Sequence, residues 1–150
     1  MSTMNHIARM SLIAMGLAAG CVAQDDGIEI GPRGGLVVSQ DGRFALDIPK
    51  GALDQSLEIT IDEVECEQTE SVGPCYEVGP IGLPLLFPGT VTYEVDSQMR
   101  DDGIDVEHLV VMTEGEQHWR PLSDHEVDMQ HELVTGSAVY LGVYAVVAVD

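Results

Sequence analysis

The chain has 150 residues, a length that suits one domain of ordinary size. Hydrophobic residues make up 45% of it, enough for a packed core, and aromatic residues only 5%, so the core is expected to be mostly aliphatic. The formal net charge of −20 at pH 7 repels phosphate backbones, which excludes nucleic acids as partners. This charge is compatible with calcium ions, cationic surfaces and basic proteins as partners. It is also typical of a protein whose charge serves only to keep it soluble.

The first 20 residues have the composition of a signal peptide. Residues 1–9 carry a single positive charge, at Arg9, and residues 10–19 form a short apolar run that ends in small residues. A positive segment, an apolar run of roughly 7–15 residues and a small-residue cleavage site are typical of a secretory signal. The run is too short to span a bilayer, which takes about 20 residues. A buried or amphipathic N-terminal helix is the alternative.

The end of this segment is more specific, because Leu17–Cys21 has the sequence LAAGC and resembles the bacterial lipobox. The resemblance implies cleavage before Cys21, a diacylglyceryl group on its thiol and an acyl chain such as palmitate on its amine. Several acyl chains anchor a protein stably, whereas one chain is marginal. The resemblance therefore predicts a lipid-anchored protein of the bacterial cell envelope. Val22, rather than an aspartate, follows the cysteine and favours the outer membrane by analogy with enteric bacteria.

Two further cysteines, Cys66 and Cys75, follow Cys21. In an exported chain a remaining pair is most simply explained by one disulfide. The enclosed loop Glu67–Pro74 is short, so the expected stabilisation is modest, about 2–3 kcal/mol. A metal site there would require more thiols or nearby histidines, and the sequence offers none.

From Gly34 onward, apolar residues recur at every second position, as in half-buried strands. We expect residues 21–32 to form the lipidated cysteine and a short acidic tether, and residues 33–150 to form one all-β domain. Glycine- and proline-containing turns at short intervals favour an antiparallel β-sandwich. No sustained helical pattern follows residue 21. The expected strands are Leu36–Val38, Phe44–Ile48, Leu57–Asp62, Val91–Val95 and Leu109–Met112, another beginning near Trp119, and the β-rich run Ala138–Val149.

Several of these segments, taken together, resemble the ZU-five domain of zonula occludens proteins, ankyrins, netrin receptors and many bacterial surface lipoproteins. The shared pattern is a Gly-Gly entry, a strand that ends in Ile-Pro, a Gly-Ala-Leu turn and an Ile-x-Ile strand, followed by two weaker segments. The resemblance covers nearly the whole chain after the tether. It rests on Gly34–Val37, Asp41–Leu53, Glu58–Ile61, Tyr76–Pro80 and Phe87–Tyr93.

The resemblance implies a sandwich that contacts other proteins, and the Pro49–Leu53 turn is expected to serve packing. Some members of the family cleave themselves at a His-Phe-Ser site, where the hydroxyl attacks the preceding carbonyl. The matching positions here are Tyr140, Leu141 and Gly142, which lack the imidazole and the hydroxyl. We therefore expect no self-cleavage.

Other candidates for chemistry are weak. His108, His118, His125 and His131 lie near acids, but their spacing is not that of a helical zinc site, and solvated surface histidines are expected. Asp101–Asp105 is acidic but lacks the pattern of a calcium-binding loop, so an ordinary turn is favoured over a weak calcium site. The apolar stretch 78–88 is expected to be a buried loop rather than a binding patch.

The sequence contains no nucleophile motif and no spare thiol, so no catalytic residue, metal ligand or cofactor is predicted. The predicted function is that of a membrane-anchored envelope lipoprotein acting as a non-enzymatic interaction or structural module. Its expected partners are the bilayer, through Cys21, and an envelope protein. The alternatives are a calcium- or cation-responsive binding module and a hydrolase with an unrecognised site.

Overall fold

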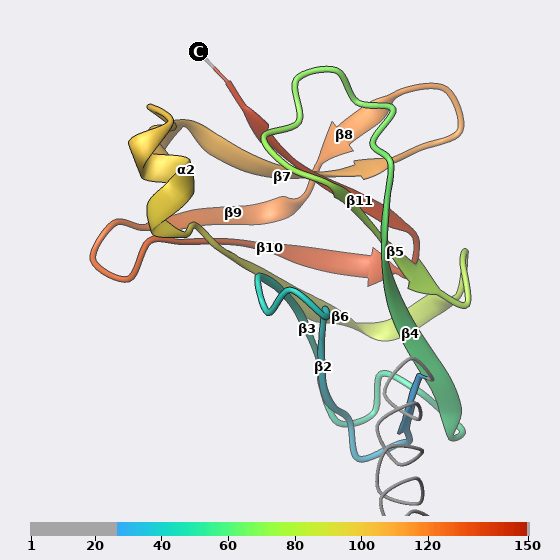
Figure 1. The fold of residues 1–150 in the computed structure, drawn as a ribbon. Coiled ribbons are helices and arrows are strands. Elements are labelled where there is room, and N and C mark those ends of the chain that lie inside the picture. Colours follow the sequence, from blue (N-terminus) through green and yellow to red (C-terminus); the bar gives the residue numbers. More distant parts are fainter. Residues whose placement is uncertain (1–26, 150) are drawn as a thin grey trace, which may run out of the picture.

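The computed structural model describes residues 27–149, which fold into two antiparallel β-sheets packed against each other (Figure 1). This confirms the expected all-β sandwich. The first sheet has the spatial order β1 (Ile28–Ile30), β4 (Leu57–Val64), β5 (Cys75–Gly79), β11 (Val143–Ala148), β7 (Leu109–Glu114) and β8 (Trp119–Pro121). The second has the order β2 (Gly35–Val38), β3 (Phe44–Ile48), β6 (Pro84–Glu94), β10 (Leu133–Tyr140) and β9 (Ser123–Asp128).

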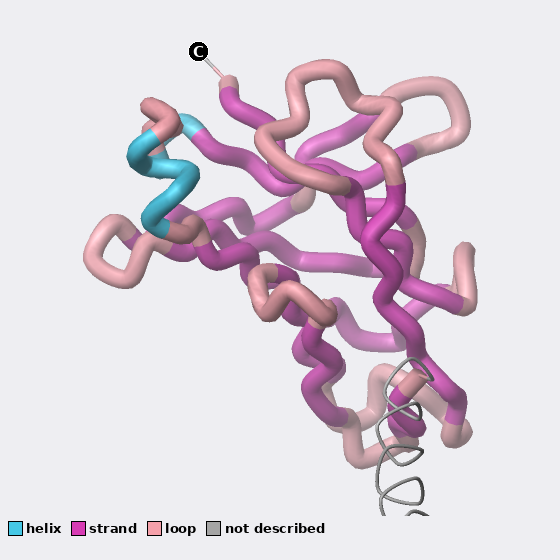
Figure 2. The backbone as a smooth tube through the Cα atoms, viewed as in Figure 1, coloured by secondary structure: helices cyan, strands magenta, loops and turns pink. Residues whose placement is uncertain are grey.

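Helical structure in this range is confined to the connection between β6 and β7 (Figure 2). The short helix α2 (Ser97–Asp101) begins after Asp96, whose side chain accepts a hydrogen bond from the Met99 backbone N–H at 2.9 Å, and a single 3-10 turn, η2 (Val106–His108), follows. Because α2 is so short, it leaves no apolar periodicity in the sequence. Among residues 27–149, no helix has the length and hydrophobicity needed to cross a membrane.

The core lies between the sheets and is mostly aliphatic, as expected, but its centre is aromatic. The ring of Phe44 stacks on that of Tyr76 at a centroid distance of 4.7 Å and lies 5.6 Å from that of Tyr144. All three side chains are almost fully buried. Each such ring removes a large apolar area from water, so the few aromatic residues contribute disproportionately to stability.

The expected strands are present, and the closing β-rich run 138–149 divides between the two sheets. β10 ends at Tyr140 in the second sheet, and β11 begins at Val143 in the first. The Tyr144 hydroxyl donates a hydrogen bond to the Tyr140 carbonyl and holds this corner. The chain therefore changes sheets within Leu141–Gly142.

The periodicity of the sequence does not reveal β1, β5 or β9. Part of the range expected as tether is β1, which pairs with β4 in the register Ile28–Ile59 and Ile30–Leu57. It is only three residues long, too short for alternation to appear. β9 is almost wholly exposed, so its sequence has no apolar face.

The prediction that the apolar stretch 78–88 is a buried loop is wrong. The stretch is neither a loop throughout nor buried throughout. It contains the end of β5, a tight turn and the start of β6. Leu85 is buried, but Ile81, Leu86 and Phe87 are more than half exposed, at 59%, 65% and 57%. Leu86 and Phe87 lie at the register shift between β6 and β10, where Ala138 pairs with Gly89 and Tyr140 with Pro84, and this irregularity leaves consecutive side chains on the surface.

The Pro49–Leu53 turn serves packing, as expected. Ala52 and Leu53 are 1% and 4% exposed and close one end of the sandwich. Gly51 adopts a φ of +85° and donates its N–H to the Pro32 carbonyl at 2.8 Å, which ties this turn to the turn before β2. A left-handed φ favours glycine at this position.

The turn between β2 and β3 is fastened to the opposite sheet by Asp41. Its carboxylate accepts hydrogen bonds from the Ser39 hydroxyl, from the Arg43 backbone N–H at 3.0 Å, and from the hydroxyl of Tyr76, in β5, at 2.7 Å. Burial raises the pKa of Asp41, but these hydrogen bonds outweigh it and hold the pKa below its usual value. The result is a polar link between the sheets beside the aromatic core.

Candidate functional site

The histidines are solvated, as the sequence predicted. His108, His118, His125 and His131 are all exposed, and they lie on different segments of the surface. His131 lies 2.8 Å from the Asp128 carboxylate through its Nδ1, and this hydrogen bond lowers the pKa of Asp128. The contact is local, because it joins the two ends of one turn.

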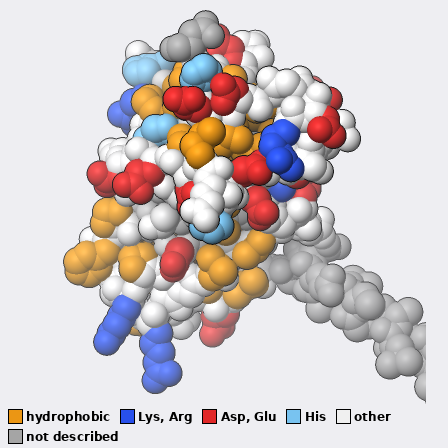
Figure 3. Space-filling model, turned by 90° about the vertical axis from the view of Figure 1, so that its left-hand side faces the viewer, with side chains coloured by type: hydrophobic (Ala, Val, Ile, Leu, Met, Phe, Trp, Pro, Cys, Tyr) orange, Lys and Arg blue, Asp and Glu red, His pale blue; other side chains and the backbone are white. Residues whose placement is uncertain are grey.

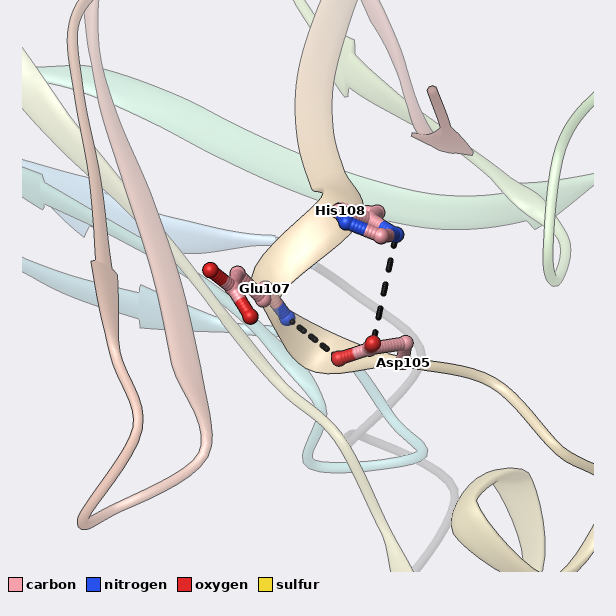
Figure 4. Close-up of side chains that lie close together, drawn as sticks. All are labelled: Asp105, Glu107 and His108. Carbon is pink, nitrogen blue, oxygen red and sulfur yellow. Dashed lines mark hydrogen bonds and ion pairs between the residues drawn. The ribbon is translucent and has the colours of Figure 1, made fainter. Parts of the chain in front are cut away.

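One histidine does lie beside two carboxylates, on the 3-10 turn η2 (Figure 4). Asp105 accepts a hydrogen bond from the Glu107 backbone N–H at 3.1 Å, and its other oxygen lies 3.9 Å from Nδ1 of His108. All three side chains are exposed. Calcium takes six to eight oxygen ligands, and zinc is bound by more enclosed sites, so this group is explained by the capping of η2.

Asp101–Asp105, the acidic turn of the sequence analysis, forms the end of α2 and the connection to η2. The side chain of Asp102 accepts a hydrogen bond from Gln98 at 3.3 Å, and that of Asp105 caps η2. The two carboxylates therefore have separate structural roles, and the expected ordinary turn is present.

Cys66 and Cys75 form the expected disulfide, with their Cα atoms 4.8 Å apart. It joins the segment after β4 to the first residue of β5, which is itself paired with β4. Cys21, the expected lipidation site, and the expected signal peptide over residues 1–20 lie outside the described residues.

One hollow in the surface of the described residues, which we call the corner cleft, has a volume of about 790 Å³. It lies where the β5–β6 turn, the β7–β8 hairpin and the β10–β11 corner meet. Ligand sites commonly measure about 300–1,000 Å³, so this hollow is large enough for a small molecule or a side-chain-bearing segment of a partner. Its lining residues are Glu77, Ile81, Gly82, Glu114–His118, Arg120 and Tyr140–Val143.

Backbone hydrogen bonds hold the walls of the corner cleft in place. The Leu141 carbonyl accepts from the Gly82 N–H at 2.7 Å, and the Gly142 carbonyl accepts from the Val78 N–H at 2.8 Å. The β7–β8 hairpin is closed by the Gly115 N–H, which donates to the His118 carbonyl at 3.0 Å. The cleft is thus formed by the β7–β8 hairpin and by two connections that cross between the sheets, β5–β6 and β10–β11.

The side chains of the corner cleft are mixed in character. Glu77, Glu114 and Glu116 supply three carboxylates, against one guanidinium from Arg120. Ile81 supplies an exposed apolar surface at the rim. This arrangement suits a partner that offers a cation next to an apolar group, because a carboxylate attracts the former and the isoleucine side chain contacts the latter.

The corner cleft also contains the positions that match the family's self-cleavage site. Tyr140 directs its hydroxyl to the Glu114 carbonyl at 3.4 Å, and Gly142 has no side chain. Among the described lining residues, no hydroxyl or thiol is hydrogen-bonded to His118. The absence of self-cleavage remains a prediction.

The sequence analysis did not identify this cleft, because its residues come from segments that are far apart in the chain. The available signals were the Gly-Pro turn at residues 79–80, in the connection between the sheets, and the Glu-Gly turn at residues 114–115, in the β7–β8 hairpin. Comparisons with protein-family models and with curated proteins find no match to this sequence.

Proposed function

We propose that this chain is a lipoprotein of a bacterial cell envelope, anchored through acylated Cys21, and that its ZU-five-like sandwich is a non-enzymatic interaction module. The corner cleft is its binding site, and the partner is an envelope protein that inserts a segment carrying a lysine or arginine beside an apolar side chain. The lipobox-like LAAGC sequence supports the anchor. The outer membrane is the favoured location.

The observation that carries the binding role is the composition of the corner cleft. Three glutamates and an exposed isoleucine surround one volume of about 790 Å³. A hydrolase would place a nucleophile and a base within hydrogen-bonding distance of each other, and the described lining residues form no such pair. Binding without chemistry is the function that this arrangement favours.

The binding role is tested by photo-crosslinking in intact cells of the source bacterium. A photoreactive residue is placed at Glu116, within the corner cleft, and in a second strain at His125, which is exposed outside it. We expect a discrete crosslinked protein from position 116 alone. We also expect Glu77→Lys together with Glu114→Lys to abolish that product, since the change reverses the charge of the cleft.

Two results would contradict the proposal. The same product from both positions would place the contact elsewhere on the surface. A product that survives the reversal of charge would show that the carboxylates of the corner cleft do not select the partner.

A further inference from the structure

One end of the sandwich, which we call the basic tip, brings two cations and two exposed apolar side chains together. It comprises the turn 31–34, the loop 49–54 and residues Leu86 and Phe87. The Gly51 N–H donates to the Pro32 carbonyl at 2.8 Å, so Arg33 and Lys50 lie on adjoining turns. These turns form the lower end of the molecule in Figure 1.

The apolar part of the basic tip is attached directly to these turns. The Leu86 N–H donates to the Ala52 carbonyl at 2.9 Å. The ring of Phe87 lies over Gly51, 3.0 Å from the point where a Cβ at that position would stand. Nevertheless, both side chains are more than half exposed. Figure 3 shows hydrophobic side chains on the lower part of one face, directly above two Lys or Arg side chains that project from the tip.

The charges of the basic tip differ from those of the remaining surface. The chain has 6 Lys and Arg residues against 26 acids. Arg43 and Arg100 are neutralised by ion pairs with Asp96 and Glu132, whereas Arg33 and Lys50 form no ion pair with any residue of the range 27–149. Asp54 in the same loop offsets one of them, but elsewhere acids dominate. Two cations against one acid make the tip a part of the surface that an anionic membrane repels less than the acidic remainder.

The described chain begins near the basic tip. Gly27 is adjacent to β1, which runs toward the tip and ends at Ile30, paired with Leu57. Four residues separate Gly27 from Gly31 in the tip, which at about 3.4 Å per residue is roughly 14 Å. Cys21 precedes Gly27 by six residues, which span at most about 20 Å. Six residues are therefore long enough for acylated Cys21 and the tip to meet the same bilayer.

We propose that the basic tip is a second membrane contact, in which Leu86 and Phe87 enter the interface of the anchoring bilayer and Arg33 and Lys50 contact anionic lipid headgroups. This inference rests on the proposed function, because it takes the bilayer that holds acylated Cys21 as the occupant. It adds an orientation: the domain rests on its tip, and the corner cleft stays accessible from the periplasm or the medium. Each cation near an anionic leaflet contributes roughly a factor of five in membrane affinity.

The test measures how deeply single tryptophans lie in vesicles. The full-length chain is extracted from membranes, weighed by mass spectrometry and reconstituted into vesicles of phosphatidylethanolamine and phosphatidylglycerol with brominated acyl chains. Trp119, the one tryptophan of the chain, is replaced by Phe. An indole is then introduced by Phe87→Trp or, as the control, by Met129→Trp, at a position that is 55% exposed in the β9–β10 turn.

We expect brominated lipid to quench the indole at position 87 several-fold more strongly than the one at position 129. Adding Arg33→Glu and Lys50→Glu should reduce this quenching, and so should replacing phosphatidylglycerol by phosphatidylcholine. Equal quenching at the two positions in an acylated protein would overturn the basic tip and leave the anchor intact. An unacylated product would overturn the proposed anchor. If that product still showed strong quenching at position 87, the membrane contact of the basic tip would be supported. If it showed no such quenching, both the anchor and the membrane contact would be overturned.

Discussion

Asp41 joins the two sheets through a single carboxylate, and its neighbour Glu63 shares its environment. Hydrogen bonds to the Asp41 carboxylate hold its pKa below the usual value, whereas burial and the Asp41 charge raise the pKa of Glu63. The two residues thus respond to pH in opposite directions. Asp41 stabilises the fold above its unfolded pKa of about 3.9, and this contribution is lost as the pH falls through its lowered pKa.

The contribution of Glu63 to stability has the opposite pH dependence, and this leads to a prediction. Its contribution is complete below the unfolded pKa of about 4.3 and is lost as the pH rises through the raised pKa of the folded state. We therefore expect Glu63→Gln to melt at a higher temperature than the wild type at pH 7, with the difference disappearing toward pH 4. The effect should be small, because Glu63 is largely exposed and solvent screens it.

Circular dichroism melts between pH 3.5 and pH 8 measure this difference. Glu126→Gln is the control, because Glu126 is exposed in β9, opposite Thr135 and away from Asp41. A difference that stays constant across the range, or one that Glu126→Gln reproduces, would contradict the coupling of Glu63 to Asp41.

At the scale of elements, the turns of the sandwich depend on glycines in two distinct ways. Gly34 and Gly42 have nearly equal φ values of +79° and +77°. A Cβ at Gly34 would stand 2.2 Å from the Ile48 carbonyl oxygen, whereas a Cβ at Gly42 would meet nothing within 4 Å. The first glycine is required by close approach of β2 to the end of β3, and the second by backbone conformation alone.

This pair predicts unequal costs for the same substitution. Gly42→Ala should cost about 1–2 kcal/mol of unfolding free energy, the usual cost of a left-handed conformation for a residue with a Cβ. Gly34→Ala should cost clearly more, because the contact with Ile48 also forces the turn apart. Urea unfolding of both variants measures the difference, and equal costs would show that the turn before β2 adjusts without loss.

The elements also show which parts of the fold the sequence can predict. Strands such as Phe44–Ile48 were predictable because one face is more buried than the other, so that apolar residues recur at every second position. β1 and β9 were not, since one is very short and the other lies almost wholly in solvent. The exposed side chains of Leu86 and Phe87 were missed because hydrophobicity does not reveal the register shift between β6 and β10 that leaves both of them on the surface.

For the molecule as a whole, the disulfide and the solvated histidines were predictable from local reasoning about cysteine pairs and spacing. The corner cleft was not, because three connections from distant parts of the chain must fold before its residues meet. The basic tip could not be predicted from the sequence either. Arg33, Lys50 and Phe87 come together through a hydrogen bond between two turns and through the packing of the Phe87 ring over Gly51. Interaction surfaces of this kind depend on tertiary contacts that a sequence pattern does not contain.

The acidic surface of the whole molecule invites comparison with calcium-binding proteins, and we predict no calcium response. Asp105, Glu107 and His108 offer too few oxygen ligands, and Asp105 is engaged in capping. Millimolar calcium and a chelator should therefore leave the melting temperature unchanged in calorimetry. A rise with calcium that the chelator reverses and Asp105→Asn abolishes would support the cation-responsive alternative.

The mass of the protein made in a Gram-negative host shows whether the chain is anchored in an envelope membrane through Cys21. The full-length gene is expressed beside Cys21→Ala, and the membrane-extracted products are weighed. We predict that the wild type lacks residues 1–20 and carries acyl chains, and that the variant carries none. A wild-type product that retains residues 1–20 without acyl chains would contradict the anchor.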